Sequence, residues 1–134
     1  MRIVLASGND SFRRALRLLL QFRPGFDVVG EANDQRELVG EIDRGDPELV
    51  LLDEDINELP FAELIATLHK LDASPAVIVF SENMAKAEAA MNAGASGFVL
   101  KGDPPNRLYV TLENIRLKDG DEKRADYHDL FQSG

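Results

Sequence analysis

Short apolar runs alternate with segments of helical periodicity along the first 117 residues. An apolar side chain at every third or fourth position is typical of a helix with one buried face. A short continuous apolar run is typical of a strand that is covered on both faces. The runs that predict strands are residues 3–6, 26–29, 49–52, 75–80 and 97–100. We therefore expect five strands, each followed by a helix.

The intervening segments carry helical stripes and signals for helix ends. The stripes are Phe12, Leu16, Leu19 and Leu20; Leu38, Val39 and Ile42; Leu64, Leu68 and Leu71; the Ala-rich residues 82–92; and Leu108, Leu112 and Ile115. Asp34 followed by Glu37 fits a capping box, and Gly94 stands where a left-handed C-cap belongs. Asp103 followed by Pro104 predicts the start of the last helix.

Strict strand–helix alternation predicts an α/β fold with a parallel sheet and helices on both faces. Right-handed crossovers leave few topologies, and the size favours a flavodoxin-like, three-layer (βα)5 fold with strand order 2-1-3-4-5. We assign residues 1–117 to this domain. After Leu117 the chain turns polar, so residues 118–134 are interpreted as a C-terminal tail or the start of a linker. Within them, Tyr127, Leu130 and Phe131 suffice for one amphipathic turn.

The composition excludes several classes of site. The 134 residues include no Cys and two His, which excludes disulfides and thiolate chemistry and disfavours a zinc site. A formal net charge of −9 argues against direct binding of nucleic acid by this chain. No apolar run approaches the ~20 residues of a membrane span, and a strand from Ile3 leaves no room for a signal peptide. We expect a soluble, cytoplasmic protein.

The charges are unevenly placed along the chain. Residues 31–63 hold 12 acidic residues against two Arg, whereas residues 1–24 hold five Arg against Asp10 alone. Two interpretations stay open. These segments form two solvated faces of opposite sign, or the first helix offers a docking face for an acidic partner.

Polar residues directly follow four of the five predicted strands. Ser7 and Gly8 follow the first strand, Asp53 the third, Ser81 the fourth and Lys101 the fifth. In an open parallel sheet, ligands bind outside the carboxyl ends of the strands, so these residues should converge. The carboxylate is a candidate nucleophile, and the hydroxyl and ammonium suit the oxygens of a phosphoryl group.

These residues and their spacing resemble a response-regulator receiver domain over nearly all of residues 1–117. Residues 47–53, Pro-Glu-Leu-Val-Leu-Leu-Asp, resemble the segment that presents the phospho-accepting aspartate. Ser81 falls at the family's Ser/Thr position. Residues 93–101, Ala-Gly-Ala-Ser-Gly-Phe-Val-Leu-Lys, resemble the stretch that carries the family's aromatic switch residue, here Phe98, and its phosphate-binding lysine, here Lys101.

The resemblance implies a signalling module rather than an enzyme. Asp53 would attack the phosphorus of a kinase phosphohistidine, while Ser81 and Lys101 would hold the phosphoryl oxygens. The shift of Ser81 would let Phe98 turn inward; alternatively, Phe98 is simply a core residue of its strand. Implied partners are a histidine kinase or another signalling protein, and a second copy that docks through helix 4, strand 5 and helix 5, or through helix 1.

The largest departure from the family lies at Ser7 and Gly8, where relatives place two acidic residues that hold Mg²⁺. Magnesium binds through carboxylates in near-octahedral geometry, and without it the charge on a transferring phosphoryl group is poorly neutralised. Asp53 and Asp55 remain as candidate ligands, so we expect Mg²⁺ binding to be weak or absent and phosphotransfer slow or absent. Further departures near the site are Asn57, Phe61, Glu82 and Gly102.

Two expectations concern the charges at this site. With no acidic pair beside it, Asp53 should form a salt bridge with Lys101 that favours the ionised carboxylate. Glu54 and Glu82 are either substitutes for the missing metal ligands or solvated loop carboxylates.

Three functions stay open from the sequence. The first is an atypical receiver whose state is set by partner or dimer contacts, favoured by Ser7 and Gly8. The second is a working phospho-acceptor with an unorthodox metal site, favoured by Asp53, Ser81 and Lys101. The third is a flavodoxin-like binder of a small ligand, which rests on fold analogy alone.

Overall fold

The computed structural model describes residues 1–56, 60–72 and 74–117 of the chain. These residues belong to two compact units, Met1–Gly102 and the residues from Asp103 onward. The first unit contains all five strands. The described part of the second unit contains a helix over residues 105–117, as its apolar stripe predicts, and Leu108 and Leu112 are buried. The expected tail 118–134, with its amphipathic turn, lies outside the described residues.

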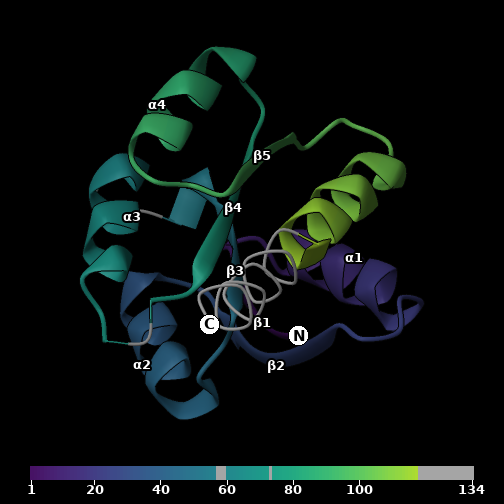
Figure 1. Cartoon of the computed structure of the whole chain (residues 1–134), viewed down its shortest axis with the longest axis horizontal. Helices are drawn as coiled ribbons and strands as arrows, with labels where there is room; N and C mark the ends of the chain where they lie inside the picture. The colour runs from purple at the N-terminus through teal and green to yellow at the C-terminus, as the bar shows by residue number, and fades with distance from the viewer. Residues whose placement is uncertain (57–59, 73, 118–134) are drawn as a thin grey trace, which may run out of the picture. The chain divides into compact units, whose positions relative to one another are not determined.

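The first unit is built on a five-stranded parallel sheet (Figure 1). Its strands are β1 (Arg2–Ala6), β2 (Asp27–Ala32), β3 (Leu49–Asp53), β4 (Ala76–Ser81) and β5 (Gly97–Leu100). They lie in the order β2-β1-β3-β4-β5, and every neighbouring pair is parallel. This arrangement confirms the predicted flavodoxin-like order. The second strand runs further than its apolar run predicts, because it pairs with β1 as far as Ala32.

Helices cover both faces of this sheet. Figure 1 shows α1 (Asp10–Gln21) on one face and α2 (Gln35–Gly45), α3 (Phe61–His69) and α4 (Ala87–Asn92) on the other. Alternate residues of each strand point to opposite faces. Val50 and Leu52 of β3 therefore belong to the cluster packed beneath α2, α3 and α4. Leu49 and Leu51 are equally buried but lie outside that cluster, toward the face that α1 covers.

Side chains fix where two of the helices, α1 and α2, begin. Asn9 precedes α1 and accepts a hydrogen bond from the Phe12 amide, which ends 3.0 Å from its Oδ1. Asp34 caps α2 through the Glu37 amide at 2.8 Å, as predicted. The Glu37 carboxylate, however, accepts from the amide of Asn33 rather than from that of the cap itself. These bonds satisfy amides that have no partner within the helix.

The predicted helix over residues 82–92 is only partly right. The structure has a 3-10 turn, η2 (Met84–Lys86), and α4 begins at Ala87. The Asn83 side chain accepts from the amide of Ala85 at 2.9 Å, so the chain turns tightly before the helix starts. A second 3-10 turn, η1 (Glu54–Ile56), follows β3 directly. Gly94 ends α4 with φ +111°, which confirms the left-handed conformation expected there.

The described part of the chain holds no helix with both the length and the apolar character that crossing a bilayer requires.

Candidate functional site

The carboxyl edge of the sheet brings Ser7, Asp53 and Lys101 together, as the sequence predicted. Asp53 is the last residue of β3 and is 1% exposed. Ser7 directly follows β1, and Lys101 directly follows β5. Because β1 and β4 flank β3, and β5 lies beside β4, the ends of these strands meet around the Asp53 carboxylate.

The buried Asp53 carboxylate has three partners. Its Oδ1 lies 2.7 Å from the Lys101 ammonium and 3.1 Å from the amide of Asp55, which donates to it. Its Oδ2 accepts a hydrogen bond from the Ser7 hydroxyl at 2.7 Å. A buried carboxylate is destabilised by the loss of water unless charges and donors replace it. These contacts confirm the predicted Asp53–Lys101 salt bridge and add two donors to it.

Lys101 contacts a second carboxylate and an aromatic ring. Its ammonium lies 3.1 Å from Oδ2 of Asp55 and 5.2 Å from the centre of the Phe12 ring. Phe12 in turn packs edge-on against Phe80, with ring centres 5.3 Å apart. Burial removes water from the ammonium and by itself lowers the pKa of Lys101. Hydrogen bonds and charge from Asp53 and Asp55 outweigh burial, so the pKa of Lys101 lies above its usual 10.5.

Ser7 is held in place on every side. Its amide donates to the carbonyl of Ala32 at 3.0 Å, and its hydroxyl accepts from the amide of Asn9 at 3.0 Å. Its carbonyl accepts from the Arg13 guanidinium, which also binds the side chain of Asn33. The hydroxyl proton is thereby directed at Asp53. The residue is 1% exposed, so this serine is a buried structural donor to the carboxylate.

Ser81 lies at the same edge but its hydroxyl bonds elsewhere. It is fully buried at the end of β4, and its Oγ accepts from the amide of Asn83 at 3.0 Å and lies 3.3 Å from the Asn83 carbonyl. The backbone still connects it to the site, because its carbonyl accepts from the Lys101 amide at 2.9 Å. Phe98 in β5 is half-buried and packs against the core cluster beneath α2, α3 and α4.

The additional carboxylates differ in their surroundings. Glu82 is exposed, as expected for a solvated loop residue. The same interpretation is wrong for Glu54, whose side chain is 10% exposed and lies 3.0 Å from the Lys86 ammonium. That contact is a charge pair without hydrogen-bond geometry. Asn57 lies outside the described residues.

The oxygen atoms at this edge do not form a set of ligands that fits a magnesium ion. Magnesium takes oxygen ligands in near-octahedral geometry, usually with one or two carboxylates. Here Ser7 directs its proton at Asp53, Gly8 has no side chain, and Lys101 engages both Asp53 and Asp55. Within residues 1–56, 60–72 and 74–117, no group of three or more His, Asp and Glu side chains is arranged to hold a metal ion.

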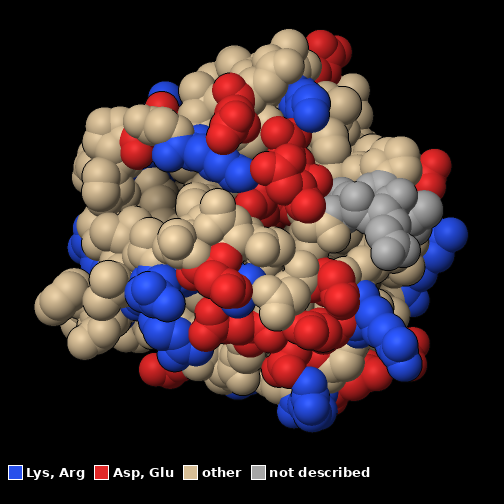
Figure 2. Space-filling view, turned by 180° about the vertical axis from the view of Figure 1, so that it is seen from behind, with Lys and Arg blue, Asp and Glu red and all other residues tan. Residues whose placement is uncertain are grey.

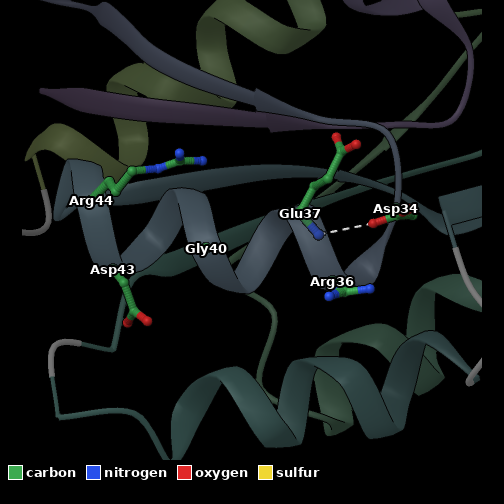
Figure 3. A pocket seen from close by; sticks show the side chains of 6 residues that line it. All are labelled: Asp34, Arg36, Glu37, Gly40, Asp43 and Arg44. Carbon is green, nitrogen blue, oxygen red and sulfur yellow. Dashed lines mark hydrogen bonds between the residues drawn. The ribbon is translucent and has the colours of Figure 1, made fainter.

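Acidic side chains gather on one face of the molecule, with Lys and Arg between them (Figure 2). A pocket of about 610 Å³ lies along α2 (Figure 3). Its lining is Asp34, Arg36, Glu37, Gly40, Asp43 and Arg44. Asp34 and Glu37 there serve the start of the helix through the bond described above. None of the site residues predicted from the sequence lines this pocket.

Sequence reasoning missed two contributors to the site and gave a third a different role. Phe12 was read only as part of a helical stripe, yet its ring lies under the Lys101 ammonium. Arg13, beside that stripe and with a side chain only 11% exposed, binds the Ser7 carbonyl. Asp55 was read as a metal candidate, whereas its carboxylate pairs with Lys101. The contacts of Phe12 and Asp55 with Lys101 join residues far apart in sequence, and the periodicity of the chain does not indicate them.

The five-stranded parallel sheet with a buried aspartate and a lysine at its carboxyl edge is the arrangement that the resemblance to a receiver domain implies. Residues 3–113 match the family model described as the response regulator receiver domain, and the chain belongs to this family. Receiver domains are signalling domains that generally have no enzymatic activity of their own. They interact with histidine kinases and typically bind Mg²⁺ for phosphorylation.

Relatives in sequence agree with this assignment. The chain is 31% identical over 116 residues to a putative transcriptional regulator of Pseudomonas aeruginosa, covering 85% of this chain and 56% of that protein. It is 28% identical over 114 residues to the chemotaxis protein CheY of Thermotoga maritima, covering 84% and 95%. The chain spans about half the length of several curated relatives, among them the regulators NarP and NarL of Escherichia coli.

Solved structures share the fold. A two-component response regulator of the LuxR family from Aurantimonas sp. is 30% identical, with a TM-score of 0.78 over 85% of this chain and 83% of that one. The isolated REC domain of RcsB from Salmonella enterica serovar Typhimurium has a TM-score of 0.80 over 87% and 88%. At 22% identity, the second likeness concerns the fold alone.

Proposed function

We propose that this chain is an atypical receiver domain of a two-component response regulator. Its phosphorylation at Asp53 is impaired, and it signals through contacts with other proteins. The proposal extends to the domain limits, with residues 1–117 as the receiver and 118–134 as a tail or linker, and to a cytoplasmic location.

The observation that carries the proposal is the set of bonds around Asp53. The Ser7 hydroxyl donates a hydrogen bond to one carboxylate oxygen, and the Lys101 ammonium forms an ion pair with the other. A metal-dependent acceptor needs its carboxylate open to a cation and to the incoming phosphorus. Here the carboxylate is neutralised and hydrogen-bonded from within the chain, which supports a resting site that is stable without a divalent cation.

Exposed apolar side chains support action through protein contacts. On α1, Leu18 is 51% exposed, and Phe22 at its end is 76% exposed, one helical turn further on. Near α4, Met84 and Met91 are also exposed. Helix 1 and the region of helix 4 are the surfaces expected to dock a histidine kinase, another signalling protein or a second copy of this chain.

Phosphorylation with a small donor tests the proposal. The protein is incubated with acetyl phosphate, with and without Mg²⁺, and its intact mass is measured; we expect no gain in mass. The Asp53→Ala variant is the control for the labelled position. A Mg²⁺-dependent gain of one phosphoryl group in the unmodified chain, absent from Asp53→Ala, would show that the site is a working acceptor.

Restoring the acidic pair adds a variant in which a gain in mass is expected, beside the unmodified chain in which none is expected. Gly8 is exposed, and a Cβ there would meet only the Asn33 carbonyl oxygen, at 3.5 Å, so a side chain fits. In a Ser7→Asp/Gly8→Asp double variant we expect Mg²⁺-dependent labelling by acetyl phosphate, because two carboxylates then join Asp53. Adding Asp53→Ala should abolish the label. A double variant that folds, binds Mg²⁺ and stays unlabelled would argue against the missing pair as the cause.

The second candidate is a working phospho-acceptor with an unorthodox metal site. It is favoured by Asp53, Ser81 and Lys101 standing at one edge of the sheet, the residue types that accept and hold a phosphoryl group. The acetyl phosphate experiment on the unmodified chain decides between the two candidates.

A further inference from the structure

The Lys101 ammonium is bound by two carboxylates of very different character. Asp53, at 2.7 Å, is buried and held by Ser7 and the Asp55 amide as well. Asp55, at 3.1 Å, has a side chain that is 71% exposed. The Lys101 side chain is itself only 16% exposed, so Asp55 covers the cation from the solvent side.

A small anion that reaches Lys101 must take the place of one of these carboxylates. Asp53 has lost its water and depends on its three partners, so displacing it from Lys101 leaves a buried charge without its cation. Asp55 regains water when it is released, because its carboxylate is already largely solvated. The exchangeable position beside Lys101 is therefore the one that Asp55 occupies.

We propose that Asp55 is a built-in anion that holds Lys101 and thereby excludes small tetrahedral oxyanions, such as phosphate, from the site. This inference deepens the proposed function, because it concerns the same lysine. The Asp55 amide donates to Asp53, and the neighbouring Ile56 is buried, so η1 holds Asp55 beside Lys101. The Phe12 ring also contacts the ammonium, with its centre 5.2 Å away.

The proposal predicts that removing the Asp55 charge creates an anion site at Lys101. Inorganic phosphate is titrated into the ¹⁵N-labelled chain at constant ionic strength, with EDTA and without a phosphoryl donor, while the Lys101 and Ser81 amide shifts are followed. We expect Asp55→Asn to bind phosphate about fivefold or more tightly than the unmodified chain. The matched control is Asp43→Asn, which removes one exposed charge on α2 away from Lys101.

Each arm of the titration has a defined meaning. A Lys101→Gln change added to Asp55→Asn should abolish the gained binding. Equal dissociation constants in the unmodified chain and Asp55→Asn, no saturable binding in either, or an equal gain in Asp43→Asn would refute the proposal. So would binding that persists without Lys101. Because neither Mg²⁺ nor acetyl phosphate is present, these results are separate from the phosphorylation test of the proposed function.

Discussion

The Asp53–Lys101 pair dominates the site at the scale of single residues. A carboxylate that is 1% exposed has lost its water, and its burial is costly unless a cation and hydrogen-bond donors replace that water. Lys101 supplies the cation, and the Ser7 hydroxyl and Asp55 amide supply the donors. The pair therefore contributes to folding as well as to any signalling chemistry.

Replacing Lys101 by Gln should destabilise the fold. The change leaves a buried carboxylate without its cation, and breaking such a pair lowers the free energy of unfolding by about 3 kcal/mol. Urea denaturation measures the loss. The exposed Lys70→Gln change on the C-terminal side of α3 is the control and should stay within about 0.5 kcal/mol. A loss as small for Lys101→Gln as for Lys70→Gln would contradict the structural role of the pair.

The pH dependence of this difference has a definite sign. Because the folded chain raises the pKa of Lys101, the extra stability is complete below the usual value of 10.5. It is lost as the pH rises through the higher value in the folded state. The stability difference between the unmodified chain and Lys101→Gln should thus be constant from pH 8 to about 10 and shrink above about 10.5. A difference that grew with pH would mean that burial, rather than the carboxylates, controls this lysine.

At the scale of elements, His69 links the end of α3 to the turn before β5. Its Nε2 lies 2.9 Å from the Gly94 carbonyl oxygen, and its Nδ1 lies 3.1 Å from the Ser74 hydroxyl. A carbonyl can only accept, so Nε2 carries the proton in this bond. The imidazole packs directly over Gly94, which leaves no room for a side chain there.

Gly94→Ala should therefore destabilise the chain. A Cβ at this position would lie 2.8 Å from the His69 Nε2. In addition, Gly94 has a φ of +111°, which residues with a side chain rarely adopt. We expect a loss of about 1–2 kcal/mol in urea denaturation. Gly102→Ala is the matched control, because nothing lies within 4 Å of a Cβ at that position. Equal effects of the two substitutions would contradict the close approach of His69.

The same scale shows why one predicted helix was shortened. Apolar spacing over residues 82–92 marks a buried face but contains no information about the turn type at its start. The side chain of Asn83 and the hydroxyl of Ser81 bond to the backbone just after β4 and fix a 3-10 turn there. Local bonds of this kind compete with the first helical turn. The helix therefore begins further along the chain than the periodic pattern predicts.

At the scale of the whole molecule, β3 lies in the middle of the sheet and is buried on both faces. Its four Leu and Val residues, Leu49, Val50, Leu51 and Leu52, are all 0% exposed. Each face of the strand packs under different helices, so a cavity in this strand has few routes for relaxation.

Leu51→Ala should therefore lower the free energy of unfolding by about 3 kcal/mol, through lost burial and the cavity left behind. Leu18→Ala is the control for the same chemical change, because Leu18 on α1 is 51% exposed. It should shift the unfolding free energy by less than about 0.5 kcal/mol. Similar losses for both variants in urea denaturation would contradict the assigned burial.

The strand runs, their order and the convergence of Ser7, Asp53 and Lys101 could all be predicted from the sequence. Apolar runs specify strands buried on both faces, and the alternation with helices leaves few topologies, so the residues that end these strands must meet at one edge. The family followed from the same positions.

Only the tertiary structure decided how the side chains at that edge pair. The position of Asp55 in the sequence is equally compatible with a metal ligand, but its carboxylate pairs with Lys101. Likewise, nothing in the periodicity of α1 distinguishes Phe12 as the ring beneath that ammonium. Strand placement follows from burial, which acts on whole segments, whereas pairing depends on distances of a few ångströms between residues that the sequence separates widely.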